Sequence, residues 1–258
     1  MEALLNRYTF AVWQRNALTW RRLMWSSLAS NVANPLIFLF AFGFGLGSVI
    51  DTMQGVTYLA FIVPGMMAYS AMFAATFETT ISAYARFKMQ KTWDAMLSSP
   101  LTLAELLTGE LLWAACKGMI SCSCVLLVGA LWGGVPSLLG GVLALPVLFL
   151  AALCFAACGL AATAHASSWE FFSYVFTFWV TPMFMFSGVF FEVARFPEFI
   201  QILSWVLPMT HLIEVIRPLA TGGPLALTAV LGHILLLVVL TALAFTLAHH
   251  RLRRRMFD

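Results

Sequence analysis

Long apolar runs separated by short polar connections dominate this sequence of 258 residues. A helix needs about 20 mostly apolar residues to cross the ~30 Å hydrocarbon core of a bilayer. Each run reaches this length and can satisfy its backbone hydrogen bonds internally, as lipid requires. The pattern predicts an all-α membrane protein with six transmembrane helices, near residues 28–50, 57–82, 106–132, 138–163, 169–191 and 224–248.

Composition favours the same environment. Apolar residues make up 62% of the chain and charged residues only 10%, whereas a soluble domain is about one quarter charged. A soluble fold would therefore lack the polar surface needed to cover itself. No internal repeat divides the chain, so residues 1–258 are expected to form a single transmembrane domain.

The basic residues cluster in three places. Eleven of the fourteen Lys and Arg residues lie in the N-terminal segment, in the connection 83–105, or at the C-terminus. With six spans all three places fall on one face, and an excess of Lys and Arg marks the cytoplasmic side. Both termini are therefore predicted to be cytoplasmic. Each cluster adjoins an apolar span, so membrane orientation explains it and no nucleic-acid partner is expected.

The segment 1–27 is predicted to form an interfacial helix before the first span. Leu5, Tyr8 and Val12 lie on one stripe, and the nearby tryptophans and arginines suit the headgroup region of the inner leaflet. The alternative is a cleaved signal peptide. The first strong apolar run begins only near Leu28, however, and it is longer than the apolar core of a typical signal peptide.

The polar connection after the second span predicts a short cytoplasmic helix over residues 85–99. From Met89 onward, apolar residues recur at i+4, i+7 and i+8, which is typical of one helix face. Pro100 ends the helix, because the residue before a proline is pushed out of the helical region. Thr102 and Glu105 then match a capping box at the start of the third span.

The segment 192–223 is amphipathic but is divided by three prolines. Apolar stripes that start at Phe199 and at Leu212 indicate two short helices, which we expect to dip into the outer boundary as a re-entrant hairpin. The alternative is a surface loop that lies flat on the membrane. The last span, 224–248, is followed by a basic cytoplasmic tail, 249–258.

Glu78 and Lys117 are ionisable residues inside predicted spans, where a charge is costly and therefore marks a functional hypothesis. Their backbones differ in depth by roughly 7 Å, a gap that the long lysine side chain can close. We expect the two to pair across adjacent antiparallel helices and to fix the packing beside a translocation path. The alternative is a static ion pair without a role in transport, and Glu110 is the competing partner of Lys117.

The sequence indicates no catalytic or metal site. The five cysteines lie inside apolar runs without CxxC spacing. Neither His165 with Glu170 nor His211 with Glu214 supplies the three or four converging ligands of a zinc site. No GxxxxGK[ST] phosphate loop occurs, so the chain is not expected to bind or hydrolyse ATP. We expect no cofactor in this chain and no enzymatic activity.

Several motifs stand out along nearly the whole chain: FIVPG at 61–65, FKMQKTWDAML at 87–97, PLT at 100–102, GELLW at 109–113 and LPMTHL at 207–212. They resemble the motifs of type-2 ABC exporter permeases, and within these the nodulation protein J group of lipo-oligosaccharide exporters. The resemblance implies a permease subunit of an ATP-driven exporter in the bacterial inner membrane. It also implies a homodimer bound to separate ABC ATPase subunits, which would carry the ATP and Mg²⁺.

The resemblance further implies that an amphiphilic substrate, a lipo-oligosaccharide, polysaccharide or lipid-like molecule, passes outward between the two copies in contact with membrane lipid. It assigns residues 87–97 to a coupling helix that docks on the ATPase through Phe87, Lys88, Met89, Lys91, Trp93, Asp94, Met96 and Leu97. The re-entrant segment would act as an outer gate that includes Pro208, His211, Glu214 and Arg217.

Other functions stay open as alternatives. Similar permeases export drugs rather than lipid-linked sugars. A secondary transporter driven by an ion gradient would be expected to show paired broken helices and several midplane charges, and an intramembrane enzyme would need a converging acid, base or metal cluster. The sequence shows neither pattern, so the ABC exporter is the preferred interpretation.

Overall fold

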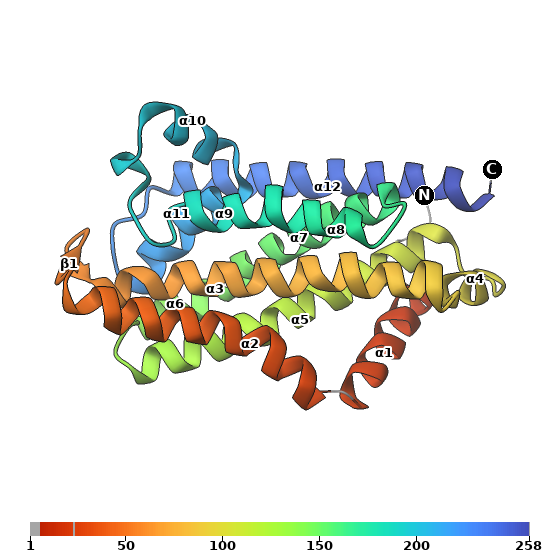
Figure 1. Cartoon of the computed structure of the whole chain (residues 1–258), viewed down its shortest axis with the longest axis horizontal. Helices are drawn as coiled ribbons and strands as arrows, with labels where there is room; N and C mark the ends of the chain where they lie inside the picture. The colour runs from red at the N-terminus through yellow and green to blue at the C-terminus, as the bar shows by residue number, and fades with distance from the viewer. Residues whose placement is uncertain (1–5, 23, 258) are drawn as a thin grey trace.

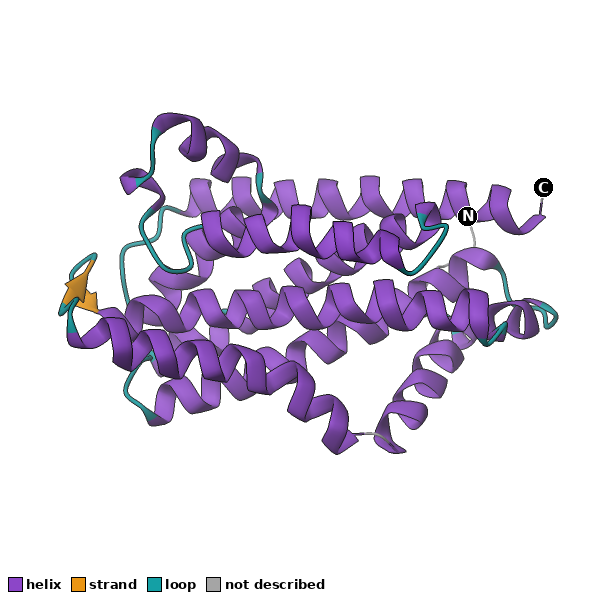
Figure 2. Cartoon of the chain, in the orientation of Figure 1, coloured by secondary structure: helices purple, strands orange, loops and turns teal. Residues whose placement is uncertain are grey.

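The computed structural model describes residues 6–22 and 24–257, which are helical almost throughout (Figure 2). The helices in the first half are α1 (Arg7–Arg22), α2 (Met24–Phe40), α3 (Tyr58–Phe77), α4 (Thr92–Leu97) and α5 (Leu103–Leu131). Those in the second half are α6 (Leu138–Leu143), α7 (Leu145–His165), α8 (Glu170–Val175), α9 (Thr181–Phe186), α10 (Glu198–Val206), α11 (Pro208–Thr221) and α12 (Leu227–Phe257). Two short strands, β1 (Thr52–Met53) and β2 (Val56–Thr57), form an antiparallel hairpin.

The long helices lie side by side with α3 at the centre. Figure 1 shows α4 and the end of α12 at one end of the molecule and the β1–β2 hairpin at the other. The α3 helix is buried along almost its whole length and contacts α2, α5, α7 and α11, whereas α12 leaves half of its apolar side chains exposed. Within residues 6–22 and 24–257, five helices are long and apolar enough to cross a membrane, and the bent pair α10–α11 would make a sixth if it counts as one span.

The run predicted as the fifth span, 169–191, forms a shorter helix than expected. It consists of α8, a π-helical turn at Phe176–Val180 and α9, and it ends at Phe186. Its length of about 25 Å is at the lower limit for a span. The helix ends there because Gly188 has a φ of 84°, a left-handed conformation that interrupts helical hydrogen bonding.

The prediction of one helix over 85–99 is wrong, because the chain forms two elements there. The helix begun by α3 continues through π-helical turns to Met89. The chain then breaks at Lys91, whose φ of 51° is left-handed, and the six-residue α4 follows. Since a left-handed residue interrupts the helix, the apolar positions from Met89 to Leu97 do not share one helix face.

The C-terminal tail predicted after residue 248 continues α12 as helix to Phe257. Arg255 Nη1 donates to the carbonyls of Ala164 at 2.9 Å and Ala166 at 2.8 Å, at the C-terminal end of α7. Carbonyls at a helix C-terminus lack intrahelical partners and favour a cation. The basic end of α12 is therefore docked on α7.

The segment 192–223 contains two short helices, as predicted. α10 and α11 are bent by 87° relative to one another, and Pro208 occupies the first turn of α11, where a proline is well tolerated. Figure 1 shows α10 standing outside the bundle at the end opposite α4. α11 packs against α3 and is largely buried.

The α1 helix packs obliquely on α5 (Figure 1). Val12 is 2% exposed and faces Gly109. A Cβ atom on Gly109 would lie 2.6 Å from Val12 Cβ and 2.8 Å from the Thr9 carbonyl oxygen. The close approach of the two helices thus requires glycine at this position, and α1 is part of the packed core and not only an interfacial element.

We predict that Gly109→Ala will lower the free energy of unfolding by about 1–3 kcal/mol, the usual cost of overpacking a tight contact. Unfolding of the purified chain by SDS titration measures the change. The matched control is Gly232→Ala in α12, where an added Cβ would meet no atom within 4 Å. Equal effects of the two substitutions would contradict the requirement for glycine at 109.

Candidate functional site

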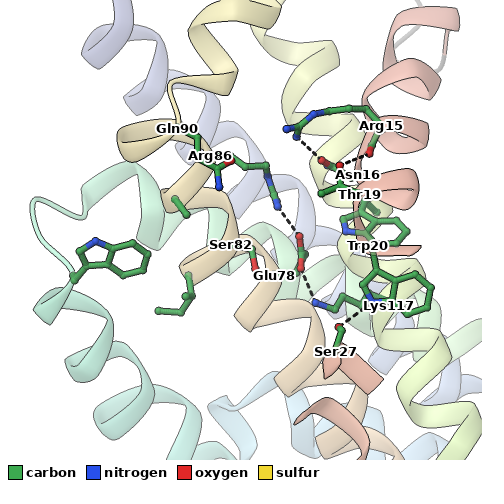
Figure 3. A pocket seen from close by; sticks show the side chains of 14 residues that line it. Arg15, Asn16, Thr19, Trp20, Ser27, Glu78, Ser82, Arg86, Gln90 and Lys117 are labelled. Atoms are coloured by element: carbon green, nitrogen blue, oxygen red, sulfur yellow. Dashed lines mark hydrogen bonds and ion pairs between the residues drawn. The ribbon is translucent and has the colours of Figure 1, made fainter. Parts of the chain in front are cut away.

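Glu78 lies in the π-helical turn that follows α3 and is 4% exposed. Its Oε1 accepts from Arg86 Nη1 at 2.8 Å, and its Oε2 accepts from Lys117 Nζ on α5, also at 2.8 Å. Figure 3 shows the carboxylate between the two cations. Glu78 and Lys117 are thus in contact across neighbouring helices, and Arg86 is an additional partner that the sequence reasoning missed.

Glu110 on α5 is completely buried and also binds Arg86. Arg86 Nε donates to Glu110 Oε1 at 3.0 Å, and Arg86 Nη2 donates to Oε2 at 2.5 Å, a two-point contact. The indole Nε1 of Trp93 on α4 donates to the same Oε1 at 3.0 Å. Glu110 was expected to compete for Lys117, but the structure gives it Arg86 and Trp93 as partners.

These five residues form one network, which we call the charge network: Glu78, Arg86, Trp93, Glu110 and Lys117. Two carboxylates face two cations, so the formal charges cancel. Buried ions are tolerated when they are paired and hydrogen-bonded in this way. The network joins the end of the α3 helix, α4 and α5, and π-helical turns such as the one that carries Glu78 occur frequently at functional sites.

The predicted docking residues divide into an inward and an outward group. Phe87 and Trp93 are buried, with ring centroids 5.2 Å apart, and Trp93 belongs to the charge network. Met96 and Leu97 are partly buried against the core. The exposed members are Lys88, Met89, Lys91 and Asp94. These four form a surface at the α4 end, which we call the α4 platform.

The structure does not bring the four predicted gate residues into one cluster. His211 Nδ1 lies 2.8 Å from His233 Nδ1 on α12, and its Nε2 lies 2.8 Å from the Trp205 carbonyl oxygen. Glu214 is exposed. His233 was missed by the sequence reasoning, although an ionisable residue inside an apolar span is a signal that could have identified it.

Arg217 faces the central helix instead. It is 6% exposed, and it donates from Nε to the Phe61 carbonyl at 3.2 Å and from Nη2 to the Gly188 carbonyl at 2.5 Å. Its guanidinium carbon also lies 3.8 Å from the centroid of the Phe61 ring. Arg217 therefore connects α11 to the N-terminal end of α3 and to the turn after α9.

No group of three or more His, Cys, Asp or Glu side chains in the described part of the chain is arranged to hold a metal ion.

Comparison with known proteins identifies the family. The family model described as ABC-2 type transporter matches residues 7–220. The chain belongs to the ABC-2 type transporter family.

The relatives of this ABC-2 chain include nodulation protein J of Rhizobium meliloti (strain 1021), which is 40% identical over 248 residues, 95% of this chain and 93% of that protein. Nodulation protein J of Sinorhizobium fredii (strain NBRC 101917 / NGR234) is 39% identical over 253 residues, with 96% and 94% covered. Inner membrane transport permease YadH of Escherichia coli (strain K12) is 26% identical over 208 residues, with 80% of each chain covered. The resemblance inferred from the sequence motifs is confirmed.

Members of this family are the membrane permease components of ABC transporters and not catalytic subunits, and they work with an ABC ATPase. The apolar helices agree with a multi-pass protein of a bacterial membrane. In the ABC-2 permease described here, the charge network and Arg217 are buried charged features that connect separate helices, and each can be tested by substitution.

We predict that Arg86→Met will destabilise the ABC-2 permease by about 3–5 kcal/mol, because it leaves Glu110 as a buried charge without a cation. The control is Arg195→Met, which removes an exposed ion pair with Glu192 at 3.4 Å and should cost less than about 1 kcal/mol. SDS unfolding titrations of both variants give the comparison. A cost for Arg86→Met as small as that of the control would show that the network does not hold the helices together.

We predict that Arg217→Lys will lower the free energy of unfolding by about 1–3 kcal/mol, because one ammonium cannot donate to both carbonyls and stack on a ring as the planar guanidinium does. The same titration measures the loss. Glu198→Gln, an exposed change on α10, is the control and should have an effect within about 0.5 kcal/mol. Full stability of the lysine variant would rule out this role of the guanidinium.

Proposed function

We propose that this chain is the membrane-spanning subunit of an ATP-driven exporter in the bacterial inner membrane, with both termini in the cytoplasm. Two copies pair around the translocation path, and each copy binds one ABC ATPase subunit. ATP and Mg²⁺ bind to the ATPase and not to this chain. The single permease domain, 1–258, supplies the path and the surface on which the motor acts.

The observation that carries this proposal is the α4 platform and its anchorage. Lys88, Met89, Lys91 and Asp94 are exposed at the end of the molecule where the basic α12 terminus also lies. Directly behind them, Trp93 is fully buried and bonded to Glu110. A force applied to the platform would therefore reach both α3 and α5 through paired, buried side chains.

Orientation follows from the basic residues. The positive-inside rule assigns the end that carries the α4 platform and the α12 arginines to the cytoplasm. One relative is named an inner membrane transport permease, which supports the same membrane for this chain. The β1–β2 hairpin and α10 then lie on the outer side.

The resemblance to the nodulation protein J group supports an amphiphilic, lipid-linked sugar as the substrate, moved outward. On the outer side, α10 and α11 would form a re-entrant gate. Pro208 sets its bend, His211 contacts α12 through His233, Glu214 faces solvent, and Arg217 holds α11 to α3. Export then requires the outer hairpin to respond to motion at the α4 platform.

We predict that Met89→Asp will prevent co-purification of the partner ABC ATPase, because it places a charge in the apolar part of the docking surface. Met89 is 66% exposed. The matched control is Phe199→Asp on α10, which changes an apolar residue that is 71% exposed at the opposite end. The amount of ATPase recovered with the tagged permease measures docking.

A loss of ATPase binding with Phe199→Asp but not with Met89→Asp would contradict the proposed orientation. Unchanged binding in both variants would contradict docking on the α4 platform. Thermal unfolding of the two variants checks that each retains its fold.

A further inference from the structure

A cavity of about 350 Å³ lies between α1, the helical turns that follow α3, α5 and the segment before α8. Figure 3 shows side chains from α1, from these turns and from α5 directed toward the same space. The cavity adjoins the charge network at the α4 end of the molecule. Its wall combines three cations, one carboxylate, an amide and three indoles: Arg15, Arg86, Lys117, Glu78, Asn16, Trp20, Trp113 and Trp169.

Asn16 lines this cavity and carries a buried hydrogen-bond donor without a partner among the described residues. The residue is 3% exposed, and its Oδ1 accepts from Arg15 Nη1 at 2.9 Å. Its Nδ2 has no hydrogen-bond partner among the described residues, although buried polar atoms are nearly always bonded. A buried donor without an acceptor costs free energy. The amide therefore indicates a ligand that carries acceptor atoms.

The charged residues around the cavity indicate the sign of the charge on that ligand. Glu78 and Glu110 are already bonded to Arg86 and Lys117. Arg15 has no ion pair with any carboxylate in the described part of the chain. Burial and, after it, the Arg86 cation lower the pKa of Arg15, and the smaller opposite effect of Glu110 does not reverse this, the direction expected where positive charge is only partly compensated. An anion in the cavity would supply it.

The indoles indicate where the ligand comes from. Trp20 and Trp113 meet edge to face, with centroids 5.8 Å apart, and Trp169 is 39% exposed. Tryptophan is enriched where the hydrocarbon core meets water, which is the level of lipid headgroups. A cavity lined by both cations and indoles suits a molecule that has an anionic part and an apolar part.

We propose that this cavity binds the phosphate-class oxyanion of an amphiphile from the inner leaflet. Arg15 and Asn16 Nδ2 donate to the oxyanion, and the indoles contact the adjoining part of the molecule. The assignment to the inner leaflet rests on the proposed function. Binding itself requires neither ATP hydrolysis nor transport, so it can be measured separately.

The test uses the full chain purified with its ATPase in detergent and titrated by calorimetry with dioctanoyl phosphatidylglycerol. Dioctanoylglycerol, which has the same chains without a phosphate, and inorganic phosphate are the comparison probes. We expect Arg15→Gln and Asn16→Leu each to weaken phosphatidylglycerol binding about tenfold, because each removes a hydrogen bond to a charged group. Arg15→Lys keeps the charge and should retain most of the affinity.

The matched control is Arg7→Gln, an exposed arginine on the same helix that does not line the cavity. It should bind like the unmodified protein. Competition by inorganic phosphate would show that the oxyanion alone is recognised, whereas binding of phosphatidylglycerol without such competition would identify a lipid headgroup.

Equal binding by Arg15→Gln and the unmodified protein, equal losses in Arg15→Gln and Arg7→Gln, or tighter binding of dioctanoylglycerol would each overturn the inference. Recovery of the ATPase with the permease is scored in the same preparations. If the unmodified protein co-purifies with the ATPase but does not bind the lipid, this site alone is rejected. Loss of the ATPase with lipid binding retained would reject the proposed function instead.

Discussion

Pairing of buried charge is the constraint on which this structure depends most. Glu78 and Glu110 lie where water does not solvate them, and an isolated carboxylate in such surroundings carries a large desolvation cost. Arg86 meets both at once because its planar guanidinium has donors in fixed directions. Lys117 completes the balance from α5. Since the partners come from different helices, electrostatic pairing also determines how those helices pack.

The same chemistry holds the opposite end of α3. Arg217 from α11 donates to the Phe61 carbonyl, roughly 35 Å along the helix from Arg86. Between these two arginines, α3 is buried against its neighbours. Charged hydrogen bonds thus attach this buried helix to its neighbours near both of its ends. In the proposed transport cycle, α3 is the element that joins the α4 platform to the α10–α11 hairpin.

Hydropathy predicted most of the fold because bilayer thickness sets the length of an apolar run. It predicted Lys117 as a site residue for a related reason, since a single cation inside such a run stands out. Arg86 was assigned to a cytoplasmic connection because the apolar run ends near residue 82, and no local pattern shows that the helix continues to Met89. Hydrophobic periodicity also does not reveal the left-handed conformation of Lys91. The helical end at Met89 and the separate helix α4 were therefore predicted as one helix. Partner choice within the network depends on tertiary packing, which single-sequence patterns do not contain.

The anion site follows from the saturation of the charge network. The charges of the two cations and the two carboxylates cancel. Each carboxylate is already paired with a cation of the network: Glu78 with Arg86 and Lys117, and Glu110 with Arg86. The contact between Val12 and Gly109 holds α1 so close to α5 that Arg15, three residues later, lies beside this neutral group. Arg15 forms no ion pair with a carboxylate in the described part of the chain. A negative charge supplied from outside the chain would therefore lower the energy of the cavity, and the close packing of α1 on α5 is what places Arg15 there.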